Sequence, residues 1–431
     1  MIKNKKPVLL YDASILTYLF ERNDMRSGIF FMAYNVLKEL KRQQIFNIIL
    51  GINYARRKFI HLMKKEAFFS EFNYIAIYDI RQYIANIKVH KEHIKKKSEL
   101  VRYIKILKNY LYIFKYNIID RHKIEKVLKK TNIFFSPRQQ YLDVESEICH
   151  HIKHFIVLHD LIPLIFHKGT INSYHWFNEI VKSLNKDTYF FCNSKYTKDD
   201  FLKYYGSQLD KNKMIVVHHA TSQIFYPDYD KKKLVTIFNK YKVQHKDSIK
   251  YIFSLCTMEP RKNLKFTVQC FIKFISKHQI QDLFFYLGGS LWDDFIQLLE
   301  EQVNNFDEYR DKIIGLGYID DNDVNILYSN SLFFAYISQY EGFGVPPLEA
   351  MQAGTPVITS NNTSLPEVVG DAGIMIDYDN EEQCIKAFED LYFNDVLREY
   401  YIQKGIERAR LFSWEKTVDI MSENMLGSLQ A

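Results

Sequence analysis

The sequence predicts two α/β domains, each built around a parallel β-sheet. The chain has 431 residues, more than one hydrophobic core usually serves, and 47% of them are apolar. Short runs that are apolar on both faces alternate with helical patterns along the chain, as in sheets covered by helices on both sides. A lysine-rich stretch with few apolar runs, residues 225–250, separates two series of such runs.

The first series lies in residues 1–224, the predicted amino-terminal domain. The chain begins with lysines ahead of an apolar run, which imitates a signal peptide. Asp12 interrupts that run, however, and Pro7 is typical of the start of a buried strand. The seven predicted strands of this domain are 8–11, 47–52, 74–78, 133–135, 155–158, 189–192 and 214–217.

The second series lies in residues 251–411, the predicted carboxyl-terminal domain. Residues 225–250 are the predicted linker, and residues 412–431 follow the second domain as a final helix. The six predicted strands of this domain are 251–255, 283–287, 313–316, 332–337, 357–359 and 374–376.

The cysteines and the apolar stretches indicate the compartment. Five cysteines are an odd number, widely scattered and without a Cys-x-x-Cys pair, which favours free thiols in a reducing cytoplasm over disulfides or a structural zinc site. The longest apolar stretches are too short or too charged to cross a bilayer. We therefore expect a cytoplasmic protein that is soluble or peripheral to the membrane.

The net charge of +7 is concentrated in one segment. Residues 81–130 contain 15 Lys and Arg against 4 Asp and Glu, and they follow a helical pattern. One hypothesis is a solvated basic face on helices that pack against the sheet. The other is a contact with an anionic membrane surface, on the inner face of the cytoplasmic membrane. No recognised nucleic-acid-binding pattern accompanies the segment, so nucleic acid is not an expected partner.

Glycine is concentrated where a ligand is expected. The chain has only 15 glycines, and nine of them fall between Gly288 and Gly373. Most follow a predicted strand. Because ligands of an open parallel sheet bind at the carboxyl ends of its strands, this clustering predicts a ligand crevice in the second domain.

The stretch EGFGVPPLEAM, residues 341–351, contains the strongest candidate site. Its glycines permit a tight loop, and Pro346 and Pro347 suit the first turn of a helix that we expect to run to Gln352. The unpaired amides at the start of that helix form an anion pocket. Glu349 alone could merely favour the helix dipole, but this does not explain Glu341. Two carboxylates beside such a loop are suited to accept hydrogen bonds from hydroxyl groups.

This stretch resembles the E-x7-E motif of the family 4 retaining glycosyltransferases, especially bacterial polysaccharide and lipopolysaccharide mannosyltransferases and related enzymes. The resemblance implies the GT-B fold, in which two Rossmann-like domains with parallel sheets face a cleft. It also implies that Glu341 contacts hydroxyls of the donor sugar and that Glu349 binds the nucleotide ribose. The backbone from Phe343 to Val345 would lie against the sugar and the diphosphate.

Other segments of the second half are similar to the same family. The stretch EPRKN, residues 259–263, follows a predicted strand and opens a helix, and the resemblance implies that Arg261 and Lys262 bind the donor diphosphate. Cys256 stands where the family usually has glycine. Tyr318 and Ile319 fall in the loop that lies near the nucleotide base in the family. Residues 412–415, FSWE, resemble the start of a last helix that crosses back to the first domain.

The first domain resembles the family more loosely. Gly28 precedes a helical pattern, and the resemblance implies that backbone here reaches the donor phosphate or the acceptor, with Arg26 as an acceptor contact. Taken alone, Gly28 could be an ordinary turn glycine. His159 ends a strand and resembles the family's sugar-contacting histidine, although a single histidine is more often structural and Asp160 could simply orient it. We expect Ser194 to cap the next helix.

The resemblance therefore assigns every candidate residue to a role. Glu341, His159, Arg261 and Lys262 are assigned to catalysis, Glu349, Phe343, Gly344, Val345, Gly28, Tyr318 and Ile319 to donor binding, and Arg26 and Asp160 to the acceptor. No cofactor and no metal are expected, because no strand is followed by a carboxylate pair suited to a metal-bridged diphosphate.

The predicted activity is transfer of a sugar from a nucleotide-diphosphate sugar to a glycan or lipid-linked acceptor. The resemblance implies retention at the anomeric carbon and a role in surface-polysaccharide biosynthesis. Two alternatives stay open. One is another GT-B enzyme, such as a nucleotide-sugar epimerase or a phosphorylase, and the other is a non-catalytic membrane or assembly protein that keeps the fold.

Overall fold

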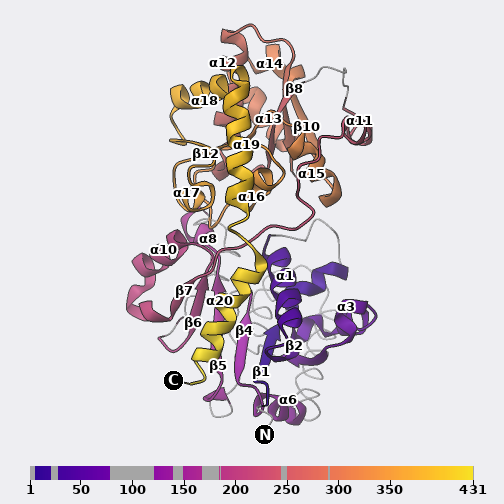
Figure 1. The fold of residues 1–431 in the computed structure, drawn as a ribbon, viewed down its shortest axis with the longest axis vertical. Coiled ribbons are helices and arrows are strands. Elements are labelled where there is room, and N and C mark those ends of the chain that lie inside the picture. Colours follow the sequence, from indigo (N-terminus) through magenta and orange to yellow (C-terminus); the bar gives the residue numbers. More distant parts are fainter. Residues whose placement is uncertain are drawn as a thin grey trace, which may run out of the picture.

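The computed structural model shows two α/β domains stacked along the long axis of the molecule, with the amino-terminal domain below the carboxyl-terminal one (Figure 1). It describes residues 5–20, 28–77, 121–138, 149–166, 184, 186–243, 250–289 and 292–430. All thirteen predicted strands are confirmed, and their ends shift by at most two residues, since the apolar character of a covered parallel strand marks it clearly.

The described part of the amino-terminal sheet has seven parallel strands in the order β3-β2-β1-β4-β5-β6-β7. The strands are β1 Val8–Asp12, β2 Asn47–Asn53, β3 Asn73–Ile77, β4 Ile133–Ser136, β5 Lys153–Leu158, β6 Tyr189–Cys192 and β7 Met214–Val216. The helices of this half are α1 Gly28–Gln43, α2 Ile60–Met63, α3 Ala67–Ser70, α6 Arg121–Leu128, α8 Ile162–Ile165 and α10 Lys195–Tyr205.

The carboxyl-terminal sheet has six parallel strands in the order β10-β9-β8-β11-β12-β13. The strands are β8 Lys250–Leu255, β9 Leu283–Gly288, β10 Ile313–Gly317, β11 Phe334–Tyr336, β12 Val357–Ser360 and β13 Ile374–Ile376. The helices are α11 Lys231–Lys240, α12 Leu264–Lys277, α13 Trp292–Gln302, α14 Phe306–Tyr309, α15 Asp321–Ser329, α16 Val345–Gln352, α17 Leu365–Val369, α18 Glu381–Phe393 and α19 Asp395–Ala409. The strand order reverses between β8 and β11, which is where open α/β sheets bind ligands.

The segment between the two strand series contributes to the second core. Within residues 225–250, helix α11 places Leu234, Ile237 and Phe238 in the carboxyl-terminal core, and Phe225 packs there too. The apolar positions i, i+3 and i+4 of this helix form a narrow stripe among lysines, which explains why the sequence pattern did not distinguish it from a linker.

The last helix returns to the first domain. Helix α20, Trp414–Gly427, runs down over the amino-terminal domain and lies beside α1 (Figure 1). Val418, Met421 and Met425 are fully buried in the amino-terminal core. The crossing implied by the family resemblance is therefore present in this chain.

The basic segment is described only in part. Of residues 81–130, those up to 120 lie outside the described residues, and residues 121–128 form α6.

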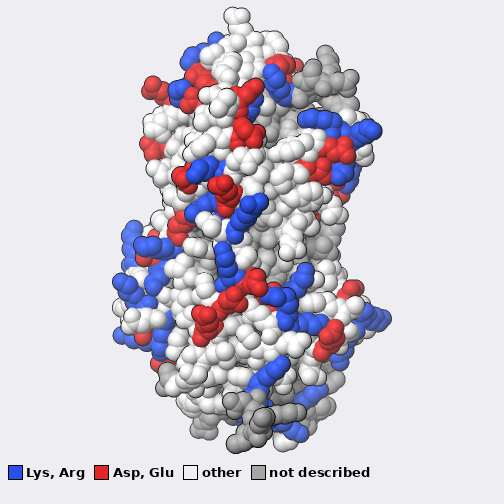
Figure 2. Space-filling view, viewed as in Figure 1, with Lys and Arg blue, Asp and Glu red and all other residues white. Residues whose placement is uncertain are grey.

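Acidic and basic side chains are interspersed on the visible face of the carboxyl-terminal domain (Figure 2). Within the described ranges, no helix combines the length and the apolar character needed to cross a membrane.

Candidate active site between the two domains

The candidate site begins with the loop between β11 and α16. Gly344 has a φ of +113°, in the region that favours glycine, and it caps the amino end of α16. Pro346 and Pro347 lie in the first turn, where their missing N–H groups cost nothing. The predicted helix is therefore confirmed, beginning one residue earlier than expected and ending at Gln352.

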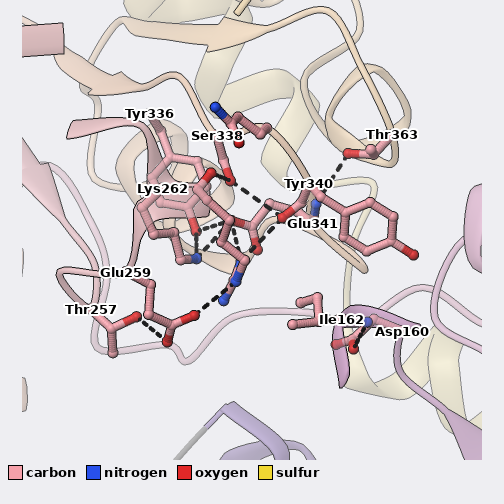
Figure 3. A network of polar contacts seen from close by, with 12 residues as sticks. Asp160, Ile162, Thr257, Glu259, Lys262, Tyr336, Ser338, Tyr340, Glu341 and Thr363 are labelled. Atoms are coloured by element: carbon pink, nitrogen blue, oxygen red, sulfur yellow. Dashed lines mark hydrogen bonds and ion pairs between the residues drawn. The ribbon is translucent and has the colours of Figure 1, made fainter. Parts of the chain in front are cut away.

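The Glu341 carboxylate is the centre of a buried polar network (Figure 3). Its Oε1 accepts hydrogen bonds from Lys262 Nζ at 2.6 Å, from Tyr336 Oη at 3.0 Å and from Arg261 Nη1 at 3.1 Å. Burial alone would raise the pKa of Glu341, but Lys262 and Arg261 outweigh it and hold that pKa below its usual value. The carboxylate is therefore ionised and fixed in position.

The two cations reach Glu341 because of the turn that follows β8. Pro260–Lys262 form a 3₁₀ turn, and Asn263 takes a left-handed conformation with φ of +57° before α12 begins. The carbonyl oxygen of Arg261 accepts a hydrogen bond from the Gln339 amide at 2.8 Å, which ties this turn to the loop after β11. Arg261 also pairs with Glu259 through Nε at 2.9 Å. Arg261 and Lys262 therefore lie together beside Glu341, and their binding of the donor diphosphate stays a prediction.

Cys256 directly follows β8, beside the end of the neighbouring strand β9. Its carbonyl oxygen would lie 1.8 Å from a Cβ atom on Gly289, which has a φ of +145°. The close backbone approach at this point therefore requires glycine at position 289, and Cys256 does not prevent it.

The surroundings of Glu349 raise its pKa, whereas those of Glu341 lower it. It lies on α16, is partly exposed, and accepts a hydrogen bond from Tyr328 Oη at 3.2 Å. Burial raises its pKa to about 7, against the lowering effect of that hydrogen bond, and Asp321 raises it further. Glu341 and Glu349 are thus two carboxylates of one motif whose pKa values are driven apart by their surroundings.

The amino-terminal domain contributes His159 and Asp160 from the end of β5. His159 Nε2 donates a hydrogen bond to the carbonyl oxygen of Pro137 at 2.7 Å, and burial lowers the pKa of His159 to about 4. The imidazole is therefore neutral, with Nδ1 as its acceptor nitrogen. Asp160 accepts from the Ile162 amide at 2.9 Å and lies across from Glu341 (Figure 3). Burial raises the pKa of Asp160 to about 6.

The two domains touch through the glycine loop. The carbonyl oxygen of Gly342 accepts hydrogen bonds from Ser194 Oγ at 2.8 Å and from Thr197 Oγ1 at 3.2 Å. A Cβ atom on Gly342 would lie 2.1 Å from the carbonyl oxygen of His159. Only glycine allows this approach, so the loop that carries Glu341 and the strand end that carries His159 are held together.

A glutamate of the second domain caps a helix of the first. The Glu367 carboxylate accepts hydrogen bonds from the Lys195 and Tyr196 amides at the start of α10, both at 2.7 Å. His218 Nε2 lies 3.3 Å from the same carboxylate. Ser194 Oγ accepts from the Thr197 amide at 2.9 Å, which confirms the predicted cap. The α10 terminus thus has one cap from each domain.

The remaining residues that were predicted to bind the donor or the acceptor are not part of the polar network around Glu341. Gly28 begins α1 with open space where a Cβ atom would lie. Tyr318 follows β10 and is 49% exposed. Ile319 is buried, and its side chain packs so close to Gly288 that a Cβ atom there would lie 2.5 Å from Ile319 Cδ1. The Phe343 side chain is buried against His218, His219 and Phe412, so only its backbone can face a ligand. Arg26 lies outside the described residues.

The sequence prediction missed two tyrosines. Tyr336 Oη accepts from Lys262 Nζ at 2.5 Å and donates to Glu341, and Tyr340 Oη donates to Asp200 Oδ2 at 2.6 Å across the domain boundary. Tyr336 lies in a strand whose composition indicated only burial. Tyr340 directly precedes Glu341, so its place in the loop was the only available signal.

Two parallel-sheet domains with a polar site at their facing strand ends define the GT-B fold. Solved GT-B structures confirm this assignment. Anabaena HepE in complex with UDP has a TM-score of 0.66 at 12% identity, with 98% of this chain and 100% of that one covered. WaaG, a glycosyltransferase involved in lipopolysaccharide biosynthesis, has a TM-score of 0.62 at 12% identity, with 97% and 100% covered.

The family model of the group 1 glycosyl transferases matches residues 236–408, in the carboxyl-terminal half of the chain. O-antigen chain mannosyltransferase B of Escherichia coli is 31% identical over 224 residues, which are 52% of this chain and 56% of that protein. The serotype-specific mannosyltransferase WbdA of Escherichia coli is 24% identical over 279 residues, 64% of this chain and 33% of that protein. The match thus spans about half the length of mannosyltransferase B and about a third of the length of WbdA. The resemblance first seen in the E-x7-E motif is confirmed.

Proposed function

We propose that this chain is a glycosyltransferase that moves a sugar from a nucleotide-diphosphate sugar onto a glycan or lipid-linked acceptor in surface-polysaccharide biosynthesis. The observation that supports this most is the Glu341 carboxylate, fixed by Lys262, Arg261 and Tyr336 at the domain boundary. The O-antigen mannosyltransferases among its relatives favour mannose as the sugar. We place the reaction at the cytoplasmic face of the membrane.

In the proposed mechanism the protein positions the donor and stabilises the leaving diphosphate. The planar guanidinium of Arg261 and the ammonium of Lys262 lie near the amino end of α16, whose first backbone amides have no side-chain cap. These groups are already in place to stabilise the negative charge that develops on the diphosphate. Glu341 accepts hydrogen bonds from sugar hydroxyls, and Glu349 from the ribose. His159, as a neutral imidazole, accepts through Nδ1 from the sugar, opposite Asp160 on the acceptor side.

We further propose that the reaction retains the configuration at the anomeric carbon and needs no metal ion. Retention follows the family that the motif resembles. Metal independence follows from the two cations beside Glu341, which supply positive charge where other transferases use a divalent ion. Turnover in excess EDTA is expected to equal turnover without it, and loss of activity that added Mg²⁺ or Mn²⁺ restores would refute this part.

The decisive experiment combines binding and turnover. A thermal-shift panel of UDP-, GDP- and dTDP-sugars should identify a stabilising donor. Turnover of that donor is then measured with and without a glycan acceptor. Acceptor-dependent transfer supports the proposal, whereas isomerisation or sugar release without acceptor would identify another GT-B enzyme. If no nucleotide sugar stabilises the protein, the non-catalytic alternative is favoured.

The Glu341→Gln variant ties the activity to the proposed site. The amide keeps the volume but cannot hold both cations, so we expect kcat to fall by roughly 100-fold or more, in line with removal of one transition-state contact. Circular dichroism should show an unchanged fold. Unchanged turnover would place the chemistry elsewhere.

A further inference from the structure

A basic pocket lies at the outer edge of the amino-terminal domain, away from the site between the domains. Its volume is about 510 Å³. Its wall combines three segments: the turn and short helix α2 that follow β2, the edge strand β3 and the helix α6. It is lined by Arg57, Lys58, Ile60, His61, Lys64, Tyr74, Ile75, Ala76, Lys123 and Ile124.

The described residues that line this pocket carry charges of one sign. Of these ten residues, four are Lys or Arg and none is Asp or Glu. Lys58, Lys64 and Lys123 form no ion pair with any carboxylate of the described residues; Lys58 and Lys64 instead lie over the rings of Phe59 and Tyr74. Many exposed lysines elsewhere are paired, for example Lys195 with Asp199. A concave site that contains these three lysines concentrates anions.

The floor of the pocket is apolar. Ile75 and Ile124 are buried, and Ile60, Ala76 and the Tyr74 ring complete the wall. The Tyr74 hydroxyl donates to the Phe69 carbonyl at 2.7 Å, which fixes the ring. Cations around an apolar floor suit a ligand with a multiply charged head and an apolar part. A phosphoryl group fits the head, since its oxygens can accept hydrogen bonds from several cations at once.

The pocket is distinct from the proposed donor site. The sheet order places β3 four strands from β5, which carries His159 at its end. At roughly 4.8 Å per strand, the two elements lie on the order of 20 Å apart across the sheet. A ligand here would therefore not compete with a nucleotide held by the second domain.

We propose that this pocket is a second anion site of the protein, which binds the phosphoryl group of an amphiphilic organic phosphate. The source of that group is either a lipid headgroup in a membrane or a soluble sugar or glycerol phosphate. The site would hold the amino-terminal domain at a phosphate-bearing surface or molecule independently of donor binding.

The test compares a pocket variant with a control of equal charge. The pocket variant is Lys64→Glu/Lys123→Glu. The control is Lys38→Glu/Lys211→Glu, which changes two exposed lysines of the same domain that also form no ion pair with described residues. The full-length proteins are tested for binding to vesicles of phosphatidylcholine alone or mixed with phosphatidic acid, and for binding of glycerol 3-phosphate by calorimetry.

The wild type is expected to bind at least one of these phosphates, and the pocket variant to lose roughly tenfold or more in affinity, because two attractions become repulsions. The control should stay within about threefold of the wild type, as expected for a change in overall charge alone. Binding to phosphatidic acid vesicles alone assigns the lipid source, and binding of glycerol 3-phosphate assigns the soluble one.

Two results would overturn the proposal: no phosphate binding by the wild type, or equal losses in the pocket variant and the control. If charge reversal unfolds the domain, Lys64→Met/Lys123→Met keeps the aliphatic stems and is judged by the same criteria. Thermal stabilisation by the nucleotide sugar should be the same in all variants, which separates this site from the proposed activity.

Discussion

At the scale of single residues, Tyr336 connects the groups that hold Glu341. Its hydroxyl accepts from Lys262 and donates to Glu341, so the three side chains form one closed network inside the protein. A network of this kind is rigid only when each member is satisfied. Tyr336 is thus a positioning residue for the carboxylate, acting through its hydroxyl.

We predict that Tyr336→Phe keeps the fold and impairs transfer. The ring remains stacked on Phe334, while hydrogen bonds to two charged groups are lost. Such bonds contribute about 1.5–3 kcal/mol each, so kcat/KM should fall roughly 10- to 100-fold. Tyr251→Phe is the matched control, because its buried hydroxyl donates to the Leu327 carbonyl. An unchanged kcat/KM in Tyr336→Phe would exclude the positioning role.

Glu349 makes stability depend on pH in a defined direction. Its pKa is raised to about 7 in the folded protein, so between its ordinary value and pH 7 the folded state binds more protons than the unfolded state. Stability therefore falls as pH rises through this window and levels off above it. One pKa unit corresponds to about 1.4 kcal/mol, and with the partial exposure of Glu349 we expect an effect of about 1–2 kcal/mol.

The variant Glu349→Gln isolates this effect. Relative to wild type, it should gain stability at pH 8 and gain none at pH 4, as measured by urea unfolding at both values. If the stability difference between the two proteins is the same at both pH values, Glu349 does not titrate as described. Donor binding by the wild type should also weaken as pH falls below about 7, because the protonated carboxyl loses acceptor capacity.

Among the helices and strands, the residues at the ends of strands could be predicted from the sequence, but their contacts with the other domain could not. Glu341, Arg261, Lys262 and His159 were located from sequence because each follows a strand in a parallel sheet, and such ends meet at one edge. The contact of Glu367 with the start of α10 was not predicted, because it joins segments of different domains. Local pattern carries no information on how two domains dock.

Helix α11 shows the same limit within one domain. Its stripe of Leu234, Ile237 and Phe238 spans barely more than one turn and is surrounded by lysines. A pattern this short does not separate a packed helix from a polar connection, because tertiary packing and not propensity stabilises it. The strands were identified more securely because covered parallel strands are apolar on both faces.

We predict that Gly342→Ala separates donor binding from transfer. The added methyl group would meet the His159 carbonyl oxygen at 2.1 Å, so the domain contact must open while the carboxyl-terminal sheet is untouched. Thermal stabilisation by the nucleotide sugar should persist, whereas kcat should fall by roughly tenfold or more. Gly206→Ala is the control, because its Cβ atom would meet nothing within 4 Å. Full activity of Gly342→Ala would show that this contact is not needed for turnover.

At the scale of the whole molecule, α20 is part of the first domain's core although it follows the second domain in sequence. Met421 is fully buried there, whereas Ile420, one position away, is 38% exposed. Two polar contacts also fasten this helix to the first domain, since Trp414 Nε1 donates to the Thr221 carbonyl at 3.1 Å and Arg42 pairs with Glu415 at 2.6 Å.

We predict that Met421→Ala destabilises the amino-terminal domain by about 2–5 kcal/mol, the usual cost of emptying a buried methionine site. Ile420→Ala, on the exposed side of the same turn, should cost less than about 1 kcal/mol. Chemical unfolding monitored by fluorescence measures both. Equal losses in the two variants would mean that the helix is not packed as described.

The return of α20 also has a consequence for synthesis on the ribosome. The described strands of the first sheet have all emerged once Val216 has been translated, but their covering layer lacks Val418, Met421 and Met425 until translation has passed the whole second domain. At roughly 5–20 residues per second this delay amounts to about ten seconds or more. Nascent chains of this protein should therefore expose an unfinished apolar surface for that time and depend on chaperones until the last helix closes it.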